Sequence, residues 1–200
     1  MRQQTSEQHV TNTAIENAVR QIIVSLGMDP NDPNFRDTPK RVRRMYQEMF
    51  DGLNSLDDLE KILAVTFPSD YKGIVIHNNM LVFSFCPHHL LPVEMDISVA
   101  YIAPKTVGLS KVPRAIELLA RRPVLQETLT HEITDLFVKY LDAQGALTVV
   151  RGKHSCMRIR GVRTLSDVVI TSDVQGFFKD NPDARSEALR LLGENRNAMV

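Results

Sequence analysis

A chain of 200 residues, of which 43% are hydrophobic and 24% are charged, is long enough for one domain with a sizeable core and a terminal extension. No apolar run approaches the roughly 18 residues of a membrane span, and the N-terminal residues lack the apolar segment of a secretory signal, which predicts a cytoplasmic protein with no membrane partner. The 24 basic and 24 acidic residues give zero formal charge, so no overall field favours nucleic acid, although local basic clusters can still bind phosphate.

The first third of the chain has helical periodicity. Apolar residues recur on one stripe of residues 11–26, and Gly27 marks the end of this helix. Thr38 and Pro39 are typical of an N-cap and a first helical position, and this second helix ends at Gly52. The pattern predicts a helical N-terminal extension over residues 1–65, followed by a second region over 66–200.

The second region alternates between strand and helix patterns. Strands are predicted at residues 80–85, 93–103, 147–162 (interrupted near Gly152) and 167–174. Two consecutive helices are predicted between the second and third strands, one ending at about Arg121 and one covering residues 126–141, and a short helix is predicted after Pro182. Strands paired on either side of two helices favour an α+β fold with an antiparallel sheet.

Both cysteines of the chain have histidine close by. Cys86 lies in the sequence CPHH with His88 and His89, and Cys156 follows His154 in HSC. Two thiols and one imidazole from the CPHH pair would form a Cys2His set, which in zinc enzymes leaves a fourth position open for water. A metal in such a site activates water at neutral pH, and a remaining histidine suits proton transfer. The alternative is a closed structural site that uses both imidazoles of the pair.

The stretch HSCMRIR is predicted to continue a strand. Period-two alternation would place His154, Cys156, Arg158 and Arg160 on one face and two apolar side chains on the other. An imidazole, a thiol and two guanidinium groups on one face indicate a site for a polar ligand.

Two further segments carry candidate ligand groups. In GLSKVPR, Ser110 is a plausible helix N-cap, and Lys111 and Arg114 share a helical face near the anion-binding end of that helix. The alternative for this segment is a solvent-exposed basic patch. Glu127, next to Gln126, either complements the dipole of its helix or accepts two N–H bonds from a guanine edge, and by sequence alone the dipole role is favoured.

Together these motifs resemble the GTP cyclohydrolase I family. The similarity covers most of the chain from Arg36 onward, and four ordered segments carry it: CPHH, GLSKVPR, RRPVLQETLT and HSCMRIRGV. The resemblance implies a tunnelling fold, in which a four-stranded antiparallel sheet carries two antiparallel helices on one face, and a homodecamer with active sites between subunits.

The resemblance also assigns roles to single residues. It implies Zn²⁺ held by Cys86, His89 and Cys156, and proton transfer by His88 and His154. It further implies guanine binding by Gln126 and Glu127, and triphosphate binding by Ser110, Lys111, Arg114 and Arg160.

The reaction implied is hydrolysis of the guanine imidazole ring of GTP, with release of formate and formation of 7,8-dihydroneopterin triphosphate, the first step of pterin and tetrahydrofolate biosynthesis. Two residues depart from the family pattern: Pro87 stands where glutamate is usual, and Pro113 is less usual in its segment. Neither removes a metal ligand or a proton carrier. A related tunnelling-fold enzyme and a non-catalytic, metal-stabilised nucleotide-binding oligomer are the alternatives.

Overall fold

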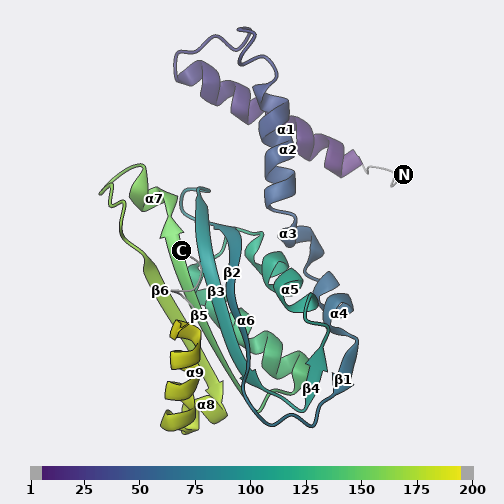
Figure 1. Cartoon of the computed structure of the whole chain (residues 1–200). Coiled ribbons are helices and arrows are strands. Elements are labelled where there is room, and N and C mark those ends of the chain that lie inside the picture. The colour runs from purple at the N-terminus through teal and green to yellow at the C-terminus, as the bar shows by residue number, and fades with distance from the viewer. Residues whose placement is uncertain (1–5, 195–200) are drawn as a thin grey trace. The chain divides into compact units, whose positions relative to one another are not determined.

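The computed structural model describes residues 6–194, which divide into two compact units between Asp51 and Gly52 (Figure 1). The first unit contains α1 (Ser6–Ser25) and α2 (Thr38–Met49). Helix α1 ends as expected, because Gly27 adopts a φ of 78° that favours glycine. Its predicted apolar stripe is only partly covered within this unit, since Ile23 is buried whereas Leu26 is 69% exposed.

The second unit begins with α3 (Gly52–Ser55) and α4 (Asp58–Leu63). The predicted division near residue 65 stays a prediction. None of the helices among residues 6–194 combines the length and the apolar character that a membrane crossing requires.

A four-stranded antiparallel sheet organises the second unit, with the strand order β2-β3-β5-β6. Its strands are β2 (Val75–Phe85), β3 (Pro92–Ile102), β5 (Gly145–His154) and β6 (Val169–Gly176). A separate two-stranded ribbon joins β1 (Thr66–Pro68) to β4 (Lys105–Val107). Strand β2 is longer than predicted because a bulge between His77 and Met80 places two asparagines within it.

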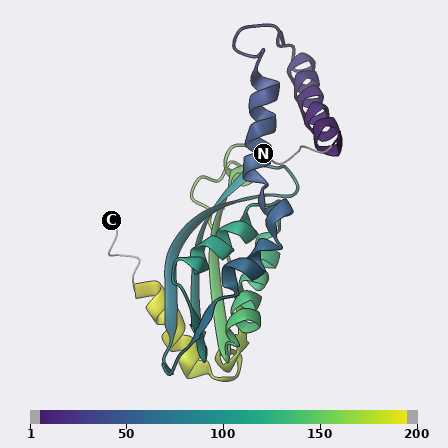
Figure 2. The same cartoon turned by 90° about the vertical axis from the view of Figure 1, so that its right-hand side faces the viewer.

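Two helices, α5 (Lys111–Ala120) and α6 (Gln126–Leu141), cover one face of the sheet, and Figure 2 shows them on the side opposite the C-terminal helices. They run antiparallel, because the connection between them bonds to Phe85 at one end of the sheet and α6 ends next to Ile102 at the other. The predicted fold class is confirmed: an α+β fold with a four-stranded antiparallel sheet and two antiparallel helices.

Alternation along β3 builds the core. Met95, Ile97 and Val99 are fully buried against the helical layer, where Leu129 and Ile133 of α6 meet them. The opposite face of the sheet is covered at one end by α8 (Phe177–Asp180) and α9 (Pro182–Glu194). The core therefore fixes the ends of β2 and β5, from which the candidate site extends.

The predicted strand from residue 147 to 162 is wrong in its second half. Strand β5 is continuous through Gly152 and ends at His154, and Ser155–Arg158 form the single helical turn α7. The reason lies in the partner strand: Val93 pairs with His154 near the start of β3, so no strand is available beyond this point. The face predicted for Cys156, Arg158 and Arg160 consequently does not exist as a strand face.

Candidate metal and substrate site

A tight turn after β2 gathers the first group of site residues. The amide of Leu90 donates to the carbonyl of Cys86 at 2.8 Å, and Leu90 adopts a φ of 52°. Pro87 suits the second position of this turn because its φ is fixed near −65°. The turn leaves the Cys86 thiol buried and places Nδ1 of His88 and Nδ1 of His89 at 3.8 and 3.7 Å from Sγ.

The sheet brings the second cysteine to this turn. Strand β3 pairs with β2 through Pro92 and Phe85 and with β5 through Val93 and His154, so the ends of β2 and β5 lie on either side of β3. The helical turn α7 then carries Cys156 back toward Cys86. Ligand atoms of Cys86, His89 and Cys156 all lie within 4.8 Å of one another, whereas His88 is not part of this group.

The donor set fits a metal ion of the zinc type. Two thiols and one imidazole are ligands that zinc prefers, and three protein ligands leave one position open. Burial raises the pKa of the Cys156 thiol, and the neighbouring Cys86 thiol raises it further, while Arg160 opposes the shift. Because a metal binds the thiolate, its binding has to displace this proton.

Arg160 contacts the same cluster. Its Nη1 lies 2.7 Å from Nε2 of His89, and because a guanidinium only donates, this imidazole nitrogen is the acceptor. A metal on Nδ1 of neutral His89 would leave the proton on Nε2, and a metal on Nε2 would use the same lone pair. In both cases Arg160 has to leave His89 when a metal binds, which frees an exposed guanidinium beside the site.

A pocket of about 230 Å³ opens beside the two cysteines. Glu127 and His88, both exposed, line it together with the half-buried His154. Burial lowers the pKa of His154, and the nearby Glu127 carboxylate opposes this effect. Sequence reasoning missed the apolar part of the wall, which carries no motif: Val124, Leu125, Met157 and Val169.

Comparison with known proteins decides the family. A model described as GTP cyclohydrolase I matches residues 15–193. The chain belongs to the GTP cyclohydrolase I family. A Rhodopirellula baltica protein named GTP cyclohydrolase 1 is 44% identical over 179 residues, which cover 89% of this chain and 77% of that protein. A Bacillus subtilis protein of the same name is 42% identical over 185 residues, covering 92% of this chain and 96% of that protein.

Two solved structures are also similar to the chain. One is an archaeosine synthase QueF-like protein in the apo form, with a TM-score of 0.43 and 14% identity over 54% of this chain and 97% of that one. The other is a dihydroneopterin aldolase from Burkholderia thailendensis bound to guanine, with a TM-score of 0.35 and 13% identity over 59% of this chain and 97% of that one. The predicted resemblance and the predicted enzyme class, GTP cyclohydrolase I, are confirmed by the family match and the curated relatives.

Three residues expected at the triphosphate of a GTP cyclohydrolase do not reach this pocket within one chain. Ser110, Lys111 and Arg114 lie at the N-terminal end of α5, next to β4. The opposite end of α5 leads to Phe85 and the pocket, since the amide of Val124 donates to the carbonyl of Phe85. Figure 1 shows β4 and α7 at opposite ends of the sheet. Ser110 occupies the N-cap position, but its side chain makes no capping hydrogen bond.

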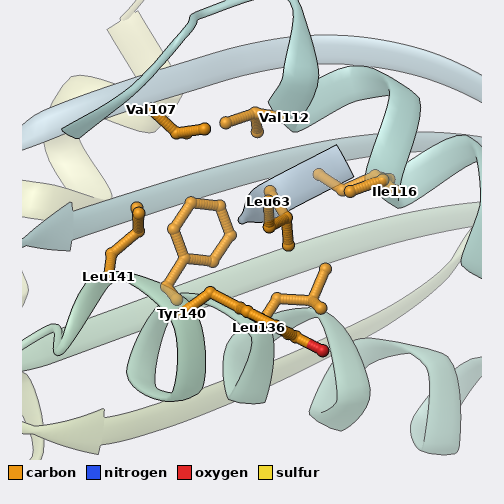
Figure 3. Close-up of a pocket in the computed structure, with 9 residues that line it drawn as sticks. Leu63, Val107, Val112, Ile116, Leu136, Tyr140 and Leu141 are labelled. Carbon is orange, nitrogen blue, oxygen red and sulfur yellow. The ribbon is translucent and has the colours of Figure 1, made fainter. Parts of the chain in front are cut away.

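A second cavity lies between the helices and β4 and has a different character. It measures only about 10 Å³, and Figure 3 shows apolar side chains converging around Leu63. Val107 and Val112 line it from one side, and Leu136 and Leu141 come from α6. Its size and apolar lining suit no nucleotide, so it belongs to the packing of the core.

Proposed function

We propose that the chain hydrolyses the imidazole ring of the guanine of GTP, releases formate and forms 7,8-dihydroneopterin triphosphate. The observation that carries this proposal is the convergence of Cys86, His89 and Cys156 beside a pocket that also contains His154 and Glu127. A binding protein needs a pocket, but it does not need an open metal position next to two further histidines.

The pocket residues have different roles in the proposed reaction, according to their chemistry. The exposed Glu127 carboxylate accepts two N–H bonds from the Watson–Crick edge of guanine, which also brings the purine against the pocket wall. His88 and His154 exchange protons with the opening ring, since they border the pocket without belonging to the close ligand group. A Zn²⁺ ion held by Cys86, His89 and Cys156 would supply the activated water for hydrolysis.

We infer that phosphate binding involves a second copy of the chain. Lys111 and Arg114 carry the charges that suit a triphosphate, but neither lines the pocket, and both lie in the first four residues of α5, a helix about 15 Å long whose other end leads to the pocket. We infer a homo-oligomer, with a decamer as the expected form, in which α5 of one subunit completes the pocket of another. Arg160, once released from His89, contributes a further cation from the same chain as the thiols. Thiolate ligands need reduced cysteines, which the cytoplasm maintains.

The test is direct. The purified, zinc-loaded protein is incubated with GTP, and formate and an oxidisable, fluorescent pterin are measured. Both products are expected, and His154→Ala should keep the metal and lose turnover. Absence of both products in a preparation with one zinc per chain contradicts the proposal, while retention of turnover by His154→Ala contradicts the role of this histidine.

The shared site has its own test. Lys111→Met and His154→Ala are each expected to be nearly inactive, because they damage different parts of the same site. If two copies build each site, mixed oligomers regain activity at about one quarter of their sites, where both contributions are intact. Mixtures that stay inactive after verified subunit exchange contradict the shared site.

A further inference from the structure

Gln126 is more deeply buried than any other polar group of the pocket. Only 3% of this residue is exposed, at the first position of α6. Its carboxamide nitrogen lies 3.3 Å from the carbonyl oxygen of Val150, 3.0 Å from that of Val169 and 3.1 Å from the hydroxyl oxygen of Thr171. One side chain therefore ties the start of α6 to both β5 and β6.

These partners fix which end of the carboxamide is nitrogen. Two of them are carbonyl oxygens, which only accept, so they must face the NH2 group. The oxygen Oε1 then points to the other side, where it lies 2.9 Å from Nε2 of His154. Because Oε1 only accepts, Nε2 of His154 must carry a proton and donate it. In the neutral imidazole the other nitrogen, Nδ1, then has the free lone pair.

Gly152 supplies the space for this contact. A Cβ atom built on Gly152 would lie 2.1 Å from Oε1 of Gln126 and 3.2 Å from Nε2 of His154. Its φ is not in the left-handed region, so the position requires the small size of glycine and not its conformational freedom. A glycine inside a strand weakens that strand, and here it permits the carboxamide to reach the imidazole.

We propose that Gln126 is a positioning residue that holds His154 in the Nε2–H form and fixes its ring, so that Nδ1 is the nitrogen that exchanges a proton with substrate or water. The catalytic consequence rests on the proposed function, whereas the protonated Nε2 rests on the contacts alone. This role differs from binding of guanine by the Gln126 side chain, because all three acceptors of its NH2 group and the donor to its oxygen are protein groups.

Two substitutions disturb the contact in different ways. Gln126→Met removes the carboxamide at similar size, and Gly152→Ala keeps the carboxamide but displaces it. Both are expected to lower kcat for GTP by about 10- to 100-fold, part of the 100- to 10,000-fold that a positioned proton-transfer group contributes. KM for GTP and zinc content should stay unchanged. Thr134→Val is the matched control, since it deletes a different buried polar group of α6, a hydroxyl that bonds to Thr148, and should leave kcat unchanged.

Solid-state ¹⁵N NMR of the zinc-loaded, histidine-labelled protein tests the contact itself, with His154→Gln identifying the signals of His154. The wild type should show a hydrogen-bonded proton on Nε2 that Gln126→Met loses. An unprotonated Nε2 in the wild type overturns the proposal. So does a rise in KM at constant kcat in both variants, which would assign Gln126 to guanine binding. If GTP is not turned over at all, the proposed function fails, and the NMR result still decides the contact.

Discussion

His88 and His89 provide the sharpest test of how the site works, because their imidazoles are almost equally close to Cys86. Their Nδ1 atoms lie 3.8 and 3.7 Å from its sulfur, yet only His89 forms a close group with Cys156 as well. Four-ligand zinc sites bind with about 10–16 kcal/mol, or roughly 3 kcal/mol per ligand. His89→Ala should therefore weaken zinc binding about 100-fold.

His88→Ala should behave differently, since His88 is assigned to proton transfer. We expect zinc affinity to stay close to that of the wild type, while kcat falls about 100- to 10,000-fold. Zinc per chain is measured after equilibration with a competing chelator, and formate release is measured on the same samples. His131→Ala is the control, because His131 is a 59% exposed histidine whose partners are Asp135 and Asp173. Equal loss of zinc in both variants of the pair would show a closed four-ligand site and refute the open position.

Three other substitutions test local features of the fold. Pro87→Ala should lower the free energy of unfolding of the metal-free protein by about 0.5–1 kcal/mol, because the unfolded chain gains conformational entropy when the proline ring is removed. An unchanged urea midpoint would show that the proline ring does not stabilise the turn. Val112→Ile should raise the free energy of unfolding by up to about 0.8 kcal/mol, because it adds a methylene to the small apolar cavity. The control Val138→Ile, at a 38% exposed position, should have little effect. Destabilisation by Val112→Ile would show that the cavity cannot hold the added methylene. Burial lowers the pKa of His77 in the folded protein. Below about pH 6.5 the unfolded chain therefore binds a proton at His77 that the folded chain does not bind, and the free energy of unfolding falls as the pH falls. Between pH 7.5 and 5.5 the wild type should lose more stability than His77→Phe, and equal losses would exclude His77 as the cause.

The elements that the sequence predicted well are those whose pattern is set by burial. The helix at 126–141 and the strand over residues 93–103 were found almost to the residue, because each has one face against the core. The bulge in β2 hid part of that strand, since Asn78 and Asn79 look like a turn when the pairing strand is unknown. Their neighbours explain their place: the Ser98 hydroxyl bonds to Asn78 and accepts from the amide of Asn79.

Residues 154–160 show a second limit of predicting secondary structure from the sequence. Period-two alternation describes a strand only while a partner strand continues, and pairing with β3 stops at His154. The ligand role of Cys156 stays a prediction, and the close group that its thiol forms with Cys86 and His89 supports it. The interruption predicted near Gly152 is wrong for a different reason: the close contact of Gly152 with Gln126 involves residues 26 positions apart and leaves no local signal in the sequence.

The basic residues at the start of α5 and the acidic residue at the start of α6 lie far apart in the fold. Lys111 and Glu127 are separated in sequence by a single helix and a short connection, and the family resemblance assigns them to opposite ends of GTP. Because α5 and α6 are antiparallel, the start of α5 and the start of α6 lie at opposite ends of the helical layer. Glu127 lines the pocket, whereas Lys111 does not, and the α5 helix that begins at Lys111 is about 15 Å long. If a second copy supplies Lys111 and Arg114 to the pocket, as proposed, a monomeric form should lose most of its preference for GTP over guanosine and keep only the contribution of Arg160.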